Sequence, residues 1–271
     1  MGLLLPLLLY SQGNHIMKGS SSLNIPTSFN LHSRDEVGST NDEVRLLAEQ
    51  GAQDGTIVWA LRQSAGRGRQ GRTWVSPEGN LYFSILLRPT VSIAEAANIS
   101  FVASLGLADA VRKFAPEFNI TLKWPNDVLI DGKKVSGVLL ESKANTLGKL
   151  EYLIMGIGIN LKHYPEDARY PATSLLEKNT GSTLKPGEML EAFLNNFDPW
   201  YKLWNKEGFG SVRVAWLDQA HGVGDKIYVR LPGETLSGRF VTIDQDGALD
   251  LDLDSGKQRL ITAGDVFFAT S

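Results

Sequence analysis

Hydrophobic positions between residues 34 and 218 follow two patterns. Continuous apolar runs bounded by turn residues predict buried strands, and apolar residues three or four positions apart predict helices. The strands predicted in this way cover residues 56–61, 80–87, 128–130, 133–140 and 152–161, and the helices cover residues 40–50, 93–113 and 186–207. We therefore expect a folded region in which buried strands and helices are mixed along the chain.

Local signals set several of these boundaries. Thr40-Asn41-Asp42-Glu43 has the spacing of a capping box, in which Thr40 begins a helix that ends just before Gly51. Asp131-Gly132 separates two apolar runs and predicts a tight hairpin turn. Taken alone, Ser39-Thr40-Asn41 is a helix cap, and it has a role in ligand binding only if this end of the helix lines a cleft.

The pattern changes after His221. Short alternating runs are separated by Pro232-Gly233, Asp246-Gly247 and Ser255-Gly256, which is typical of a small β-barrel. Residues 249–254 alternate leucine with aspartate. These aspartates are candidates for a metal site, but a period of two predicts leucine inside and aspartate outside, and we favour that structural interpretation.

The first 33 residues lack periodic patterns and are interpreted as a flexible leader. The apolar run at residues 2–9 is interrupted by Pro6 and is far shorter than the ~20 residues that span a bilayer. A secretory signal requires a basic residue in front of its apolar run, and none precedes this one. Pro6 also stands where the myristoylation pattern requires Ser or Thr. We interpret residues 1–16 as a mis-started leader with Met17 as the true start, and a cleavable targeting segment is the alternative.

Composition narrows the classes of function. The 271 residues are 42% hydrophobic and 21% charged, which predicts a folded chain with a substantial core. The 27 Lys and Arg against 30 Asp and Glu give a net charge of −3, so we expect neither nucleic acid nor a membrane as a partner. The absence of cysteine excludes disulfides, thiolate metal ligands and a thiol nucleophile, and it fits a cytoplasmic location.

The segment Gly66-Arg67-Gly68-Arg69-Gln70-Gly71-Arg72, followed by Thr73-Trp74, is the strongest chemical signal. It matches G-x-G-x-x-G, but a dinucleotide-binding turn needs a helix directly afterwards, and a strand follows here instead. Glycines let backbone N–H groups approach an anion, arginines bind phosphate or carboxylate, and a tryptophan face can stack on a purine. The segment therefore predicts a loop that folds over a phosphorylated, nucleotide-bearing ligand; a solvated basic turn is the alternative.

A second signal is Lys123-Trp124-Pro125-Asn126-Asp127, which follows a predicted strand end. Pro125 keeps the preceding chain extended, so Lys123 can project into a cleft as a cationic clamp. Asn126 and Asp127 can bind a phosphate, a water on Mg²⁺, or only the backbone of the turn.

Glycines inside predicted strands form a third signal. Gly137, within the run that contains Lys134, indicates the close approach of a ligand or of another backbone. Gly156 and Gly158 interrupt an apolar strand just before Asn160, and each costs stability there. They fit a flat ligand lying against the strand, with Asn160 reading a base edge; tight packing of the strand against a helix is the alternative.

In this order, the segments resemble those of the biotin–protein ligases, also called holocarboxylase synthetases or biotin–[acetyl-CoA-carboxylase] ligases. The motifs are Ser-Thr-Asn at 39–41, Gln63 ahead of GRGRQGRTW, then KWPNDV, GKKVSGVLLE and GIGIN. The resemblance implies an α+β fold, with a class II aminoacyl-tRNA synthetase-like mixed sheet, flanking helices and a small C-terminal SH3-like β-barrel. It divides the chain into a leader (1–33), a catalytic domain (34–218) and the barrel (219–271).

The resemblance also implies a reaction that uses ATP, Mg²⁺ and biotin. The biotin carboxylate attacks the α-phosphorus of ATP to give biotinyl-5′-AMP, and a lysine of a biotin carboxyl carrier domain then displaces AMP. Cationic groups are needed because carboxylate and triphosphate repel each other. By resemblance, the catalytic residues are Lys123 and Arg69; the biotin-binding residues are Ser39, Thr40, Asn41, Gln63, Arg67, Gly68, Arg69, Lys123 and Gly137; the nucleotide-binding residues are Arg67, Arg72, Trp74, Asn126, Lys134 and Asn160; and Asp127 is the candidate Mg²⁺ ligand.

Two features depart from the family pattern. Relatives that also act as repressors carry an N-terminal DNA-binding domain, for which 33 residues are too few, so a repressor is not expected. Some relatives place an arginine soon after the Gly-Asp or Gly-Glu of the last strand to help bind ATP, and residues 264–269 contain none.

Other interpretations stay open at this point. A lipoate–protein ligase shares the fold and the adenylation chemistry but generally lacks the arginine–glycine loop. A non-catalytic biotin sensor is the alternative from another class of function. Relatives occur as monomers and as homodimers formed by sheet extension, and the sequence does not decide between these states.

Overall fold

The computed structural model describes residues 23–168, 170–178 and 184–268, so residues 1–22 of the leader predicted at 1–33 lie outside the described residues. Seven strands form a mixed sheet in the order β1-β2-β3-β7-β6-β5-β4, in which β1 and β2 run parallel and the other neighbours antiparallel. The strands are β1 (Asn30–Val37), β2 (Thr56–Gln63), β3 (Leu81–Leu87), β4 (Ile120–Lys123), β5 (Asp127–Ile130), β6 (Lys133–Ala144) and β7 (Leu150–Ile159).

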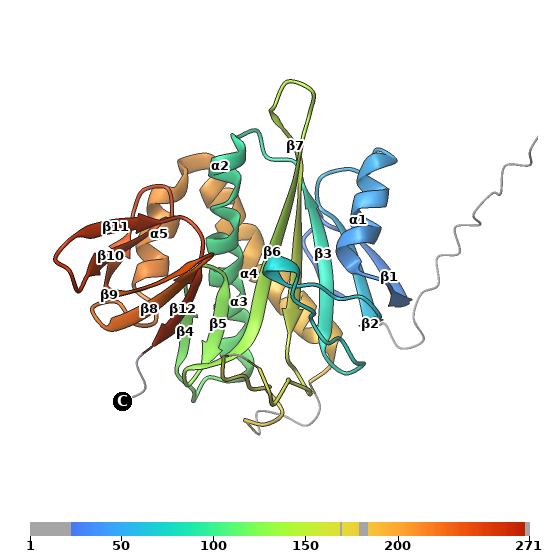
Figure 1. The fold of residues 1–271 in the computed structure, drawn as a ribbon. Helices are drawn as coiled ribbons and strands as arrows, with labels where there is room; N and C mark the ends of the chain where they lie inside the picture. Colours follow the sequence, from blue (N-terminus) through green and yellow to red (C-terminus); the bar gives the residue numbers. More distant parts are fainter. Residues whose placement is uncertain (1–22, 169, 179–183, 269–271) are drawn as a thin grey trace, which may run out of the picture.

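Helices cover both faces of this sheet (Figure 1). Helix α1 (Thr40–Glu49) packs on β2, β3 and β7, where Val44 and Ala48 meet Val58, Leu86 and Ile154. The opposite face carries α2 (Ile93–Ala96), α3 (Ile99–Phe114) and α4 (Pro186–Glu207). The sheet is therefore a middle layer, and its two faces have separate hydrophobic clusters.

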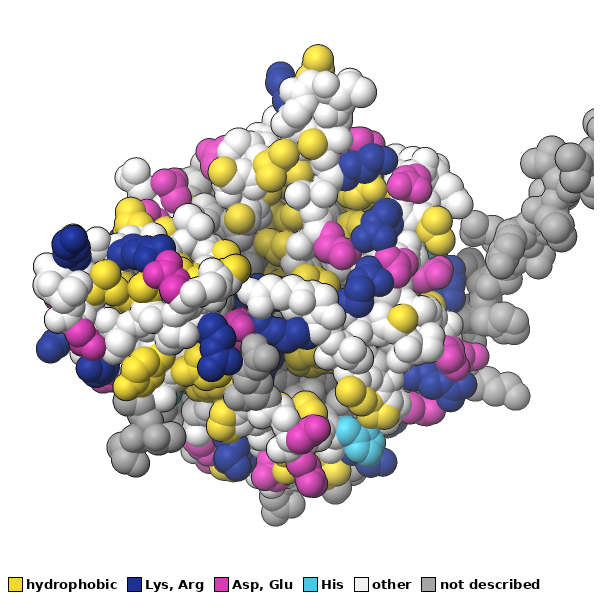
Figure 2. Space-filling view, in the orientation of Figure 1, with side chains coloured by type: hydrophobic (Ala, Val, Ile, Leu, Met, Phe, Trp, Pro, Cys, Tyr) yellow, Lys and Arg dark blue, Asp and Glu magenta, His cyan; other side chains and the backbone are white. Residues whose placement is uncertain are grey.

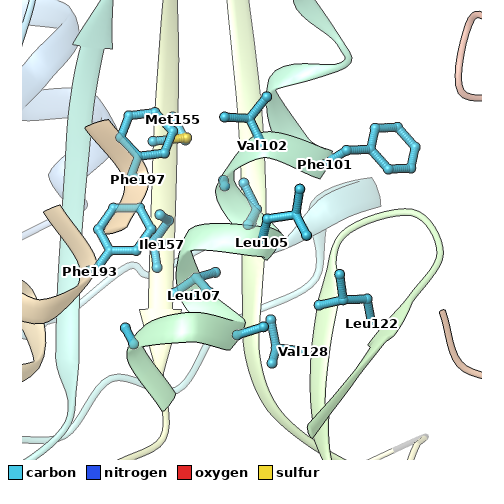
Figure 3. Packing of buried hydrophobic residues seen from close by; sticks show 14 of the residues in the cluster. Phe101, Val102, Leu105, Leu107, Leu122, Val128, Met155, Ile157, Phe193 and Phe197 are labelled. Carbon is cyan, nitrogen blue, oxygen red and sulfur yellow. The ribbon is translucent and has the colours of Figure 1, made fainter. Parts of the chain in front are cut away.

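The larger cluster lies between the sheet, α3 and α4. Phe193 and Phe197 of α4 face Met155 and Ile157 of β7, with Leu105 of α3 beside them (Figure 3). The two helices approach closely at Gly106, because this residue has no side chain: a Cβ there would be 2.9 Å from the Cα of Phe197. By length and composition alone, residues 93–114 could cross a membrane. However, 72% of the apolar 18-residue stretch within them is buried inside this fold, so α2 and α3 are helices of the core.

The C-terminal part is a separate antiparallel sheet in the order β11-β10-β9-β8-β12, reached through α5 (Phe209–Leu217). The predicted turns at Gly233, Gly247 and Gly256 join its strands, and all three glycines have positive φ. Leu249 and Leu251 are fully buried and Asp252 is exposed, which confirms the predicted alternation. Its strands are β8 (Lys226–Leu231), β9 (Glu234–Ile243), β10 (Leu249–Leu253), β11 (Gln258–Ile261) and β12 (Asp265–Phe268).

The two sheets are tied together beside the end of β4. The backbone N–H of Leu122 donates to the carbonyl of Gln219, and the N–H of His221 donates back to the carbonyl of Leu122, at 2.9 and 2.8 Å. The indole N–H of Trp124 donates to the carbonyl of Gly247 at 3.0 Å. Beside these bonds, Nζ of Lys123, the last residue of β4, lies 5.8 Å from the ring centroid of Phe267 in β12. The α+β class, with a large mixed sheet and a second antiparallel sheet, is thus confirmed.

Three local predictions were wrong. Thr40 does not cap α1, because its hydroxyl donates to Gln63 and accepts from Ser84; it is the first residue of the helix, and Ser39 is the N-cap without a side-chain capping bond. The single helix predicted at 93–113 is two helices, since the chain bends at Ala97 and Asn98 after a capping box between Ser92 and Glu95. Residues 30–33, assigned to the flexible leader, pair with β2 as the start of β1.

Candidate active site

A cavity of about 440 Å³ opens on the α1 face of the sheet, beyond the N-terminal end of α1. Lys and Arg side chains gather beside acidic ones near the middle of this face (Figure 2). Every residue predicted for the site lines the cavity: Ser39, Thr40, Asn41, Gln63, Arg67, Gly68, Arg69, Arg72, Trp74, Lys123, Asn126, Asp127, Lys134, Gly137 and Asn160. The structure therefore brings the five motifs together, whereas the ligand that each residue contacts stays a prediction.

One wall of the cavity is a buried chain of hydrogen bonds. The backbone N–H and the hydroxyl of Thr40 both donate to Oε1 of Gln63, at 2.8 and 3.1 Å. The Gln63 amide nitrogen donates to Oγ of Ser76 at 3.0 Å, and Ser84 Oγ lies 2.7 Å from the Thr40 hydroxyl. A polar group buried in this way is held in one orientation by its partners. This wall presents fixed donors and acceptors that suit a small polar ring.

The two glycines of the β7 strand make room for protein side chains. A Cβ at Gly156 would clash with the carboxamide of Asn41, so at this position tight packing against α1 explains the glycine. A Cβ at Gly158 would be 2.5 Å from Cε2 and Nε1 of the Trp74 indole. The flat group that lies against this strand is therefore Trp74, which itself forms part of the cavity wall.

The first half of the 66–74 loop is held by two carboxylates. The guanidinium of Arg67 donates to both oxygens of Asp42, at 2.6 and 2.8 Å, and lies 3.6 Å from Oε1 of Glu141. Glu141 also accepts from Asn41 and from Arg45, each at 2.8 Å. Hydrogen bonding from Arg67 lowers the pKa of Asp42. The side chain of Arg67 thus joins the loop to α1 and β6, a role that the sequence did not indicate.

The second half of the loop reaches the C-terminal sheet. Arg69 donates to Oδ1 of Asn126 at 2.9 Å and to the carbonyl of Gly264 at 3.2 Å, and burial lowers its pKa. Arg72 forms an ion pair with Asp265. Burial acts to raise the pKa of Asp265, but hydrogen bonding from Arg72 and nearby positive charges outweigh it, so the pKa is lowered. The loop therefore spans both sheets.

Lys123 is the buried cation of the cavity. Its side chain is 6% exposed, and its Nζ lies 3.3 Å from the ring centroid of Tyr170 and 5.8 Å from that of Phe267. Burial lowers the pKa of Lys123 to about 8, although the charge of Asp127 opposes this shift. Among the described residues, no carboxylate lies within ion-pair distance of this ammonium group. An anionic ligand would strongly stabilise a buried cation that is held over aromatic faces.

Asp127, the predicted Mg²⁺ ligand, is paired with a lysine. Its Oδ1 lies 2.6 Å from Nζ of Lys134, and a Cβ at Gly137 would be 3.0 Å from the same nitrogen. Within the described ranges, no group of three or more His, Asp or Glu side chains has a metal-binding arrangement. Mg²⁺ commonly binds through one carboxylate together with substrate phosphates. The residues present fit that mode, with Asp127 as the carboxylate, and do not fit a cage made of protein ligands.

Two predicted nucleotide contacts hold the backbone in this structure. Asn126 donates to the carbonyl of Val138 at 2.5 Å while it accepts from Arg69. Asn160 is 4% exposed and donates to the carbonyl of Thr173 at 3.1 Å. Both asparagines line the cavity, so their contact with a nucleotide stays a prediction beside these structural roles.

Several residues that line the cavity or hydrogen-bond to its lining residues were not predicted from the sequence. Ser84 was detectable as the polar position in the otherwise apolar run LYFSILL, and Glu141 as the charge that ends GVLLE. Asp42 had been interpreted only as part of a capping box. Tyr170 and Asp265 gave no local signal, because their positions depend on packing between segments far apart in the chain.

Comparison with known proteins relates this chain to one family. Residues 36–160 match the Biotin/lipoate A/B protein ligase family, and residues 224–269 match the Biotin protein ligase C terminal domain. Over 236 residues the chain is 39% identical to the biotin–[acetyl-CoA-carboxylase] ligase of Paracoccus denitrificans, covering 85% of this chain and 97% of that protein. It is 31% identical over 234 residues to the bifunctional ligase/repressor BirA of Bacillus subtilis, covering 84% and 71% of the two chains.

A solved structure extends this similarity to the whole fold. The biotin protein ligase from Aquifex aeolicus in complex with biotin and ATP matches with a TM-score of 0.75 and 31% sequence identity. The match covers 89% of this chain and 99% of that one, so both sheets are included.

Proposed function

The chain belongs to the biotin protein ligase family, and from this premise we propose that it joins biotin to a lysine of a biotin carboxyl carrier domain through biotinyl-5′-AMP. The observation that carries the proposal is the buried ammonium of Lys123, which lies between a fixed polar wall and an arginine-bearing loop. This arrangement offers one end of the cavity to a neutral polar ring and the other to anions.

The first step requires two anionic groups to meet. The biotin carboxylate attacks the α-phosphorus of ATP, forms an acyl–phosphate bond and releases pyrophosphate. The Lys123 ammonium holds the carboxylate oxygen and the α-phosphate oxygen, and Arg69 and Arg72 supply further positive charge from the loop. Charge placed in advance in a water-poor site stabilises such a transition state most effectively. Mg²⁺, when bound to the phosphates near Asp127, supplies additional charge neutralisation.

The second step transfers the acyl group to an amine. A neutral acceptor lysine attacks the acyl carbon of biotinyl-5′-AMP, forms an amide, expels AMP and loses a proton. The 66–74 loop keeps the mixed anhydride enclosed until an acceptor arrives. Arg67 holds this loop to α1, and Arg69 and Arg72 hold the loop to the start of β12. The acetyl-CoA carboxylase in the name of the Paracoccus relative supports a carboxylase carrier domain as the acceptor.

A lipoate ligase is the alternative from the same fold, since the first matching family covers both activities. The match of residues 224–269 to a biotin protein ligase C-terminal domain favours biotin. The test is to incubate the protein with ATP, Mg²⁺, a purified biotin carboxyl carrier domain and either biotin or lipoate. We expect mass spectrometry to show one biotin on one acceptor lysine and no lipoyl transfer. Transfer of lipoate alone, or no transfer with a folded protein, would contradict the proposal.

A further inference from the structure

Asn80, at the entry to β3, binds three consecutive backbone N–H groups with one oxygen. Its Oδ1 accepts from Leu161, Lys162 and His163 at 3.0, 2.8 and 2.9 Å. Its Nδ2 donates to the carbonyl of His163 at 2.8 Å. The side chain is 2% exposed, and these contacts lie about eighty residues away in the sequence. Successive N–H groups that converge in this way form a concave site of positive dipoles. Here the Asn80 amide fills that site.

This contact fixes the start of the segment that follows β7. The backbone at Gly79 lies close to the same turn, since a Cβ there would be 3.1 Å from Lys162 Cδ. Further along, the backbone carbonyl of Asn160 accepts from the N–H of Leu175 at 3.1 Å, and its side-chain Nδ2 donates to the carbonyl of Thr173. Two buried asparagines therefore anchor the chain on both sides of the residues between them.

The anchored segment forms the cavity wall beside Lys123. His163, Tyr164 and Tyr170 line the cavity, and the ring of Tyr170 covers the Lys123 ammonium. The wall formed by Thr40, Gln63 and Ser84 belongs to other elements, α1, β2 and β3. A loosened segment should therefore disturb the anionic end of the cavity and leave the polar-ring end in place.

We propose that Asn80 is a positioning residue for the nucleotide end of the site: it sets the affinity for ATP by holding the N–H groups of residues 161–163. The choice of ATP rests on the proposed function, whereas the anchoring itself rests on geometry alone. Loss of the side chain leaves three backbone donors without their acceptor, which is costly where water cannot reach all of them.

The experiment compares Asn80→Ala, Asn80→Asp and the matched control Asn98→Ala. Asn98 is also buried, at 4% exposed, but it lies outside the cavity lining, which includes Asn80. Pyrophosphate release gives kcat and the KM for ATP, and calorimetry with biotin alone gives its Kd. For Asn80→Ala we expect the KM for ATP to rise about tenfold and the biotin Kd to rise by no more than about threefold, because biotin shares only its carboxylate with the Lys123 end and keeps the wall of Thr40, Gln63 and Ser84. Asn80→Asp keeps the triple acceptor and should recover most of the ATP affinity, and Asn98→Ala should change neither constant.

Equal changes in the ATP and biotin constants, or no change in either, would overturn the proposal. Hydrogen exchange of the ligand-free proteins gives a readout that is independent of activity. Asn80→Ala should lose protection at the amides of 161–163 while the sheet keeps its own. If the wild type releases no pyrophosphate, the proposed function fails, and this exchange pattern still decides the anchoring. Unchanged protection at these amides, or a uniform loss across the sheet, would contradict it.

Discussion

Trp74 and Gly158 are in direct contact across the candidate active site. The indole of Trp74 occupies the space that a side chain at position 158 would need, with Cε2 and Nε1 each 2.5 Å from a Cβ built there. Trp74 closes the arginine–glycine loop and Gly158 belongs to the central strand β7. The position of the loop therefore depends on the absence of a side chain in the sheet, and the two motifs are coupled through one contact.

Gly158→Ala should displace the indole and weaken ligand binding. The added methyl group meets Trp74 at well below van der Waals distance, so the loop must shift, and overpacking of this kind typically costs about 1–3 kcal/mol. We expect kcat/KM for biotin-dependent pyrophosphate release to fall by about one order of magnitude while the protein stays folded. The control is Gly210→Ala, where a Cβ meets nothing within 4 Å. An unchanged kcat/KM in Gly158→Ala would show that the Trp74 contact is irrelevant to the reaction.

Lys123→Ala should nearly abolish adenylate formation. Removing one preorganised charge from a closed site typically raises the barrier by ~3–4 kcal/mol, which is two to three orders of magnitude in rate. Quenched-flow detection of biotinyl-5′-AMP measures this step directly. A variant that forms the adenylate at nearly the wild-type rate would exclude Lys123 from the first step.

The lowered pKa of Lys123 gives the reaction a characteristic dependence on pH. The ammonium form binds the carboxylate, and it is lost as the pH rises through about 8 in the free enzyme. Because kcat/KM reports the ionisation of the free enzyme, kcat/KM for biotin should decline above that pH. Lys123→Arg keeps its charge over the whole range and should remove this decline. Identical profiles for wild type and Lys123→Arg would assign the decline to another group.

Arg69→Gly should separate synthesis of the adenylate from its retention. The substitution removes two bonds, to Asn126 and to the carbonyl of Gly264, that hold the loop near the C-terminal sheet. Each bond from a charged donor contributes about 1.5–3 kcal/mol, which is comparable to the entropy cost of ordering a loop residue. The variant should still form biotinyl-5′-AMP but release it, so that bystander amines on serum albumin become biotinylated. Gln70→Gly is the control, because it adds a glycine to the same loop and keeps the Arg69 guanidinium; equal albumin labelling by the two variants would argue against a role for Arg69.

The Arg67–Asp42 ion pair should stabilise the fold modestly and only above acidic pH. In the folded protein the pKa of Asp42 lies below its usual value near 3.8. The ion pair therefore contributes its full stabilisation above pH 3.8, and this stabilisation is lost as the pH falls through the lowered pKa. Asp42 is 40% exposed, so solvent screening limits the effect of Asp42→Asn to about 0.5–1 kcal/mol at pH 7. Urea unfolding of both proteins should show this difference shrinking toward about pH 3. Glu36→Gln, at an exposed pair with Arg62, is the control, and a difference that grows on acidification would contradict the assignment.

Much of the fold was predictable because the apolar periodicity is strong. The helix at 186–207 and the strands of the hairpin around Asp131 and Gly132 lie where the pattern predicted them. Strand β1 was missed because polar residues occupy both of its faces, Arg34 and Glu36 on one and Ser33 and Asp35 on the other, so this edge strand shows no alternation of apolar and polar positions. Helix α5 was missed for a different reason: it is short, and Gly208 and Gly210 at its start are poor helix formers.

The membership of the site was also predictable, but the partners of its charges were not. The motifs identified residues that converge on one cavity, although they come from the first turn of α1, the 66–74 loop and the strands β2, β4, β6 and β7. The sequence could not indicate that Arg67 binds Asp42 or that Arg72 binds Asp265, because both pairs arise from packing of distant segments. The glycines of β7 were explained only by their neighbours, Asn41 at Gly156 and Trp74 at Gly158.

The central claim is that this cavity activates biotin as an adenylate, and isotope exchange between ATP and labelled pyrophosphate tests it most directly. The exchange needs no acceptor protein, because it reports reversible formation of biotinyl-5′-AMP in the closed site. We predict that the wild type exchanges label only when biotin is present, that lipoate does not replace biotin, and that Lys123→Ala abolishes the exchange. Exchange without biotin, exchange supported by lipoate instead, or undiminished exchange in Lys123→Ala would contradict the account.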